Sequence, residues 1–171
     1  MSIFKETPNP AVNRTPAGDA GGASAASVPV GLLVRRTGIP ATLMAHEDIL
    51  PEEQQLAKAW VAVRGKYSEA WESLDHLIHS NAIAALRVIE EIHHLLMSAA
   101  TRDMDAWGLL AAGPLEDLLA DRGCEVIDLV EQLAKQQPEF RKLLSGVWKH
   151  GMDDELYARV QKASDPTFKF A

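Results

Sequence analysis

Two carboxylate–histidine pairs have a spacing that could bind a metal ion. Glu90 and Glu91 each precede a histidine by three residues, His93 and His94. Di-iron helical bundles use this spacing, but they take one such pair from each of two helices. Here both pairs overlap on one predicted helix, where neighbouring residues point about 100° apart. We therefore expect packed or solvated histidines, and we predict no metal and no cofactor.

The remaining reactive side chains do not form a catalytic set. Cys124 follows Gly123 near a predicted helix start, where a thiolate is favoured, but no spacing ties it to His150. One cysteine excludes an intramolecular disulfide and a zinc site made of cysteines alone. We predict no catalytic residues, and a metal-dependent enzyme stays open only as a minority hypothesis.

The composition disfavours several classes of protein. The chain has 171 residues, of which 47% are hydrophobic and 6% aromatic, and its formal net charge is −7. This apolar content is sufficient for the core of one domain. The acidic balance and the few aromatics disfavour nucleic-acid binding. We expect no transmembrane helix, no secretory signal and no membrane partner, and therefore a cytoplasmic location.

Composition also divides the chain into four segments. Residues 1–27 are rich in Pro, Gly, Ala, Ser and Thr, which predicts a flexible, disordered arm. Residues 28–50 are apolar but interrupted by proline and glycine, which predicts an extended strap that lies on the body or docks on a partner. A helical domain follows at 51–163. In the tail, 164–171, Phe168 and Phe170 either fold back on the body or enter a partner's groove.

The body has apolar residues at helical spacing and no sustained strand-like alternation. Gly65 is expected to end a first helix, a second begins near Ser68, and Asn81 caps a third. Further helices are predicted at about 104–112, 114–122, 124–137, 138–145 and 154–163. Gly113, Gly123, Gly146 and Gly151 stand at the breaks, Pro114 and Pro138 at helix starts, and the tryptophans Trp60, Trp71, Trp107 and Trp148 are expected in the core.

A shift of 41 residues aligns two parts of the body. Residues 74–78 then match 115–119, and residues 86–92 match 127–133. This period lies in the range of HEAT-type helix pairs, although two amphipathic helices can also align by chance. We predict an all-α fold, either a short HEAT-like stack of helical hairpins or an irregular helical bundle.

Several motifs carry a resemblance to a known family. They are Ala59-Trp60-Val61-Ala62, Leu74-Asp75-His76-Leu77-Ile78, Ala112-Gly113-Pro114-Leu115-Glu116-Asp117-Leu118-Leu119, Phe140-Arg141 and Gly146-Val147-Trp148. Through them, roughly residues 50–163 resemble a bacterial helical domain family of unknown function. The resemblance implies a helical fold and brings no established activity.

The negative charge is concentrated in residues 103–131, which contain eight acidic residues and one basic residue, Arg122. The rest of the chain is neutral. Such a run is either a solvated face or a surface that steers a basic partner. The predicted partner-binding residues are Asp103, Asp105, Glu116, Asp117, Asp121, Glu125, Asp128 and Glu131, together with Phe168 and Phe170.

These patterns favour a non-catalytic protein-binding module whose partner presents a basic surface. Its sharpest form is an immunity-like or inhibitor protein. The alternative is a structural subunit of a larger complex or a homo-oligomer.

Overall fold

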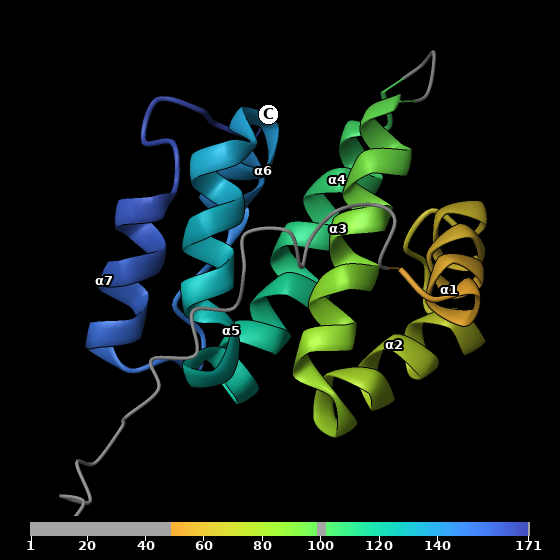
Figure 1. Cartoon of the computed structure of the whole chain (residues 1–171). Helices are drawn as coiled ribbons and strands as arrows, with labels where there is room; N and C mark the ends of the chain where they lie inside the picture. Colours follow the sequence, from red (N-terminus) through yellow and green to blue (C-terminus); the bar gives the residue numbers. More distant parts are fainter. Residues whose placement is uncertain (1–48, 99–101, 171) are drawn as a thin grey trace, which may run out of the picture. The chain divides into compact units, whose positions relative to one another are not determined.

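The computed structural model describes residues 49–98 and 102–170, all of which belong to one compact unit, Ile39–Ala171 (Figure 1). The described residues contain helices and no strand, so the predicted all-α fold is confirmed for this part of the chain. The predicted arm and all but the last two residues of the predicted strap lie outside it. The helices are α1 (Pro51–Ala62), α2 (Glu69–Ser80), α3 (Ala82–Ser98), α4 (Met104–Leu110), α5 (Glu116–Gln136), α6 (Pro138–Leu143) and α7 (Asp154–Ala163).

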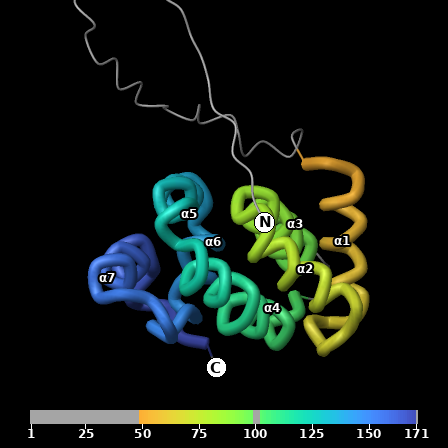
Figure 2. The backbone as a smooth tube through the Cα atoms, turned by 90° about the horizontal axis from the view of Figure 1, so that it is seen from below, coloured from red at the N-terminus to blue at the C-terminus, as the bar shows by residue number. Residues whose placement is uncertain are grey.

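Helices α3 and α5 lie at the centre of this unit. α1 and α2 pack on α3, whereas α6 and α7 pack on α5, and α3 and α5 contact each other (Figures 1 and 2). Eleven of the 17 residues of α3 are buried, among them Glu90, Glu91 and His93. A helix that is apolar on most of its sides is the one expected to be surrounded by others.

The helix does not end at Gly113, as the sequence predicts, but continues from α4 into α5 through a π turn, Ala111–Leu115. Pro114 has no N–H to donate and its ring would clash within a regular α-helix, so the wider turn accommodates it. A Cβ atom at Gly113 would lie 2.7 Å from Cη2 of Trp71 on α2. Gly113 is therefore required for close packing rather than for ending a helix.

The break predicted at Gly123 is confirmed to within one residue, because α5 has a kink at Arg122, where φ is −132° and ψ is 19°. A Cβ atom at Gly123 would collide with the side chain of Leu156 on α7, so this glycine too serves close packing. The 41-residue shift carries Asn81, between α2 and α3, onto Arg122. It thus relates α2 to the π turn and the start of α5, and α3 to the part of α5 after its kink, while the HEAT-like description stays a prediction.

Candidate binding surface

Glu90 and His93, which have the spacing of metal ligands, form a buried network that joins α3 to its neighbours. Trp107 Nε1 donates a hydrogen bond to His93 Nδ1 at 2.9 Å, and Gln137 Nε2 donates one to Glu90 Oε1 at 2.6 Å. Burial, followed by the charge of His94, lowers the pKa of His93 to about 4, so its ring is neutral at pH 7. Among the described residues, no group of three or more His, Cys, Asp and Glu could hold a metal ion.

Four of the eight predicted carboxylates pair with arginine side chains. Hydrogen bonds from the arginines lower the pKa of Asp103, Glu125 and Glu131. Half of the predicted acidic residues are therefore paired within the molecule, although Arg159 serves two of them and one negative charge remains. The pairs are Arg64–Asp103 (2.6 Å), Arg122–Glu125 (2.6 Å), Arg159–Asp128 (2.5 Å) and Arg159–Glu131 (2.8 Å).

Glu116 is buried, and its carboxylate holds the backbone of another segment. The N–H of Trp148 donates to Glu116 Oε2 at 2.9 Å, and His150 Nδ1 lies 3.7 Å from Glu116 Oε1. The segment bound in this way follows the 3-10 turn Leu144–Gly146. Because Glu116 is only 9% exposed, a partner cannot use it as a surface charge.

The prediction that Trp148 lies in the core is wrong, because its side chain is 72% exposed. Trp60 and Trp107 are buried as predicted, and Trp71 is partly buried and packs on the core. Val147 has extended backbone angles and is buried. Successive side chains point to opposite sides in extended backbone, so burial of Val147 turns Trp148 outward.

Three carboxylates remain close together and form what we call the acidic patch: Asp75, Asp117 and Asp121. Within the described residues, no lysine or arginine lies within ion-pair distance of them; Asp121 Oδ2 is 3.3 Å from His79 Nε2, and Asp75 Oδ1 is 3.9 Å from His79 Nδ1. Burial raises the pKa of Asp117, and the neighbouring carboxylates Glu116, Asp121 and Asp75 raise it further, against the opposing charge of His150. The acidic patch is thus a place where like charges repel one another.

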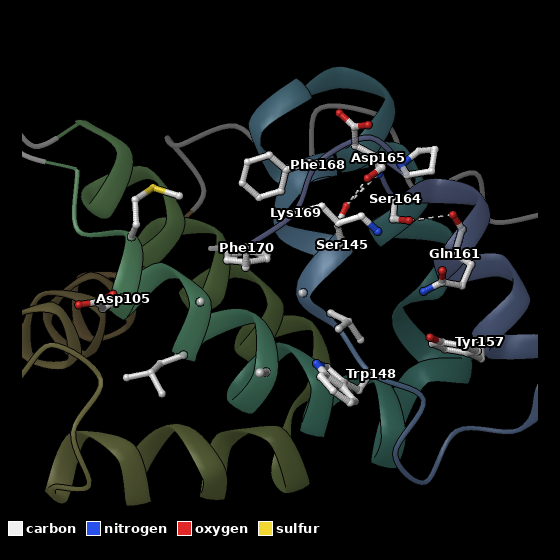
Figure 3. A pocket seen from close by; sticks show the side chains of 17 residues that line it. Asp105, Ser145, Trp148, Tyr157, Gln161, Ser164, Asp165, Phe168, Lys169 and Phe170 are labelled. Carbon is white, nitrogen blue, oxygen red and sulfur yellow. Dashed lines mark hydrogen bonds between the residues drawn. The ribbon is translucent and has the colours of Figure 1, made fainter.

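A groove of about 750 Å³ lies beside Trp148 (Figure 3). Its lining comes from α4 and the π turn, from residues 145–148 and from residues 157–170. Three small residues, Gly108, Ala112 and Gly146, belong to this lining, and the two glycines admit the ring of Phe170. Of the lining side chains, Trp148, Leu109 and Met104 are large, apolar and exposed, the last two by 47% and 42%. Asp105, another predicted site residue, is exposed and also lines the groove.

Phe168 and Phe170 pack on the body. Their ring centroids lie 5.6 Å and 5.1 Å from that of Trp107, and both are partly buried. The side chain of Ser145 helps to hold this segment, because its Oγ donates to the carbonyl of Asp165 at 2.7 Å and accepts from the Asp165 N–H at 3.1 Å. Of the two predicted alternatives, the structure has the segment folded back, with both rings lining the groove.

The groove has two serine hydroxyls in its lining, and both are engaged in hydrogen bonds within the chain. Its lining contains no histidine and no cysteine. Ser145 bonds the backbone of Asp165, and Ser164 Oγ donates to the carbonyl of Gln161 at 2.8 Å. Neither hydroxyl is paired with a base that could activate it. Cys124 is a free, exposed thiol outside this groove.

Comparison with known families agrees with the helical fold. The model of a family of unknown function, DUF6869, matches residues 61–167. The chain belongs to the DUF6869 family. The DUF6869 region contains the acidic patch, Trp148 and nearly all of the groove. The predicted resemblance to a helical family of unknown function is confirmed.

The other comparisons are negative. No curated protein and no solved structure matches the chain. None of the described helices is long and apolar enough to cross a membrane. What the DUF6869 region does must therefore be argued from its own surface.

Sequence analysis misses the groove and the exposure of Trp148. One signal was present: Gly108 and Ala112 are four residues apart, so two small residues share one helix face. That pattern indicates a helix face on which another side chain or segment packs closely. It cannot say whether the approaching group is Phe170 of this chain or a partner.

Proposed function

We propose that this DUF6869 protein is a non-catalytic protein-binding module. The observation that carries the proposal is the state of Trp148: its side chain is exposed while its backbone is fixed by the buried carboxylate of Glu116. Tryptophan is enriched among the few residues that dominate binding energy at protein interfaces. An aromatic anchor that is already positioned loses less entropy on binding.

The acidic patch supports a partner with a basic surface. Asp117 and Asp121 have no lysine or arginine within ion-pair distance among the described residues, and burial, followed by repulsion from neighbouring carboxylates, raises the pKa of Asp117. Lysine or arginine side chains of a partner would relieve this repulsion and would speed association at low ionic strength. An immunity-like or inhibitor protein is the sharpest form of this proposal. A cytoplasmic location and the absence of a nucleic-acid ligand stay predictions.

Charge reversal tests the role of the acidic patch. We expect the double variant Asp117→Lys, Asp121→Lys to capture its partner from a lysate of the native cell at least tenfold less well than the wild type. The matched control is Glu52→Lys, Glu155→Lys, which reverses two exposed carboxylates on α1 and α7. Quantitative mass spectrometry of the captured proteins measures both. Equal capture by the two double variants and the wild type would contradict the proposal.

A homo-oligomer or a structural subunit is the second candidate, because the exposed Trp148, Leu109 and Met104 could also pack on another subunit. Light scattering tests it: a monomeric mass at high concentration, with no co-purifying protein, would exclude it. A metal-dependent enzyme is not proposed, since Glu90 and His93 are engaged in the buried network.

A further inference from the structure

One end of the groove is filled by the chain itself. A Cβ atom at Gly146 would lie 2.6 Å from Phe170 Cε2, and one at Gly108 would lie 3.4 Å from Phe170 Cδ1, so the Phe170 ring fits a notch between two glycines. Phe168 lies beside it, with ring centroids 5.2 Å apart. Lys169, between them, is exposed. This end of the groove therefore accommodates an aromatic–lysine–aromatic segment.

Another part of the groove lies beside Trp148, which stands apart from the Phe168–Phe170 segment and below it in Figure 3. The exposed side chains of Leu109 and Ala112 belong to the same lining. Exposed apolar side chains in a concave surface gain free energy when another apolar side chain covers them.

A carboxylate follows the residue that binds Trp148. Glu116 is buried and accepts a hydrogen bond from the Trp148 backbone N–H, and Asp117, the next residue on α5, is only partly buried and interacts with His150. A cation on the face of the Trp148 indole would be attracted by the ring, and a carboxylate near this segment would add to that attraction. Asp105, in the groove lining, is a second exposed carboxylate.

We infer that the groove binds an extended segment of a partner protein in which a large apolar side chain is followed closely by arginine or lysine. The apolar side chain contacts Leu109 and Trp148, and the cation lies against Trp148 on the side of Asp117. This inference rests on the proposed function and specifies the chemistry of its partner. The chain's own Phe168–Lys169–Phe170 segment has the same combination of side chains.

A labelled peptide tests the inference on the full chain. The probe is a fluorescein-labelled octapeptide with the central sequence Phe-Arg-Phe-Arg between Gly-Ser and Ser-Gly ends, and the control probe has Glu in place of both Arg. Fluorescence anisotropy should give a Kd on the order of 100 μM for the basic probe, a modest affinity as expected for a short flexible peptide. The acidic probe should bind at least tenfold more weakly.

Variants locate the binding. Trp148→Ala should weaken the basic probe at least tenfold, and Ala112→Phe, which fills the groove and keeps Trp148, should do the same. Tyr67→Ala, which removes another aromatic side chain that is 79% exposed, should leave binding unchanged. No anisotropy change up to about 1 mM protein, equal binding of both probes, or insensitivity to both groove variants would overturn the inference.

Two further outcomes separate this inference from the proposed function. If a partner is captured through the acidic patch but the basic probe does not compete for it, the groove inference alone fails. If the probe binds at Trp148 and no protein is captured from the native cell, the proposed function fails and the groove chemistry stands. If the molecular mass doubles at high protein concentration and the probe prevents this dimerisation, the groove binds a second copy of the chain. That result would overturn the partner inference.

Discussion

Glu116 and His93 are both buried polar residues, and each holds a different part of the molecule. Burying a polar group is costly unless it finds a hydrogen-bond partner. The carboxylate of Glu116 accepts from the backbone of Trp148, and the neutral ring of His93 accepts from Trp107. The first bond positions the exposed anchor of the candidate surface, and the second fixes the core beneath Phe168 and Phe170.

His93 makes stability depend on pH. Its folded-state pKa of about 4 lies below the ordinary value of 6.5, so the unfolded chain binds a proton more readily than the folded one. The stabilisation is complete above pH 6.5 and is lost as the pH falls from 6.5 towards 4. By pH 5 the loss should be about 2 kcal/mol.

Urea unfolding at pH 7.5 and at pH 5 measures this loss. His93→Gln keeps an acceptor for Trp107 and removes the titrating group, so its stability should change less between the two pH values. An identical change in the variant and the wild type would show that His93 is not the group responsible.

Glu116 should control the order of the Trp148 backbone. In Glu116→Leu the Trp148 amide loses an acceptor worth about 1.5 kcal/mol or more, so its hydrogen exchange should become at least tenfold faster. Glu116→Gln retains an acceptor oxygen and should keep the amide protected. Nuclear magnetic resonance measures exchange at this one amide. Equal exchange in all three proteins would mean that Glu116 does not position Trp148.

At the scale of the elements, local chemistry predicts where most helices begin. Ser68 and Asn81 accept hydrogen bonds from the N–H groups of Trp71 and Ala84, as their predicted capping roles require. Pro138 is the first residue of α6. These helix starts depend on residues only a few positions apart in the chain, so they can be predicted from a single sequence.

Glycines show where sequence analysis fails. A glycine that ends a helix and a glycine that admits a neighbouring side chain look alike in a sequence. Only the positions of Trp71 against Gly113 and of Leu156 against Gly123 distinguish the two roles. The same limit applies to the candidate surface, whose acidic run is visible in the sequence. The arginines that pair with part of it are distant in the chain: Arg64 lies in the turn after α1, and Arg159 lies on α7.

Two glycine-to-alanine substitutions should differ in their effect on the free energy of unfolding. Alanine normally stabilises a helix relative to glycine, yet Gly113→Ala should destabilise the protein by about 1–3 kcal/mol, because its Cβ would meet the packed ring of Trp71. At Gly151, the nearest atom to an added Cβ is Ala120 Cβ, at an ordinary 3.9 Å, so Gly151→Ala should be neutral or slightly stabilising. Thermal unfolding compares the two. A Gly113→Ala protein as stable as the wild type would contradict the packing role of this glycine.

At the scale of the whole molecule, the net charge of −7 is not spread evenly. Three arginines pair with Asp103, Glu125, Asp128 and Glu131, whereas no lysine or arginine among the described residues lies within ion-pair distance of the acidic patch. The exposed Trp148 lines the groove, and its N–H donates to Glu116, the residue before Asp117 of the patch. Exposed apolar side chains and carboxylates are the two features that the proposed basic protein partner would contact.

Affinity purification from the native cell with Trp148→Ala tests the central claim most directly. The wild type, Trp148→Ala and the control Tyr67→Ala are tagged identically, and the captured proteins are quantified by mass spectrometry. We predict at least one protein that the wild type and Tyr67→Ala enrich equally and that Trp148→Ala retains at least tenfold less. Identical sets and amounts of captured protein for all three would contradict a binding function centred on Trp148.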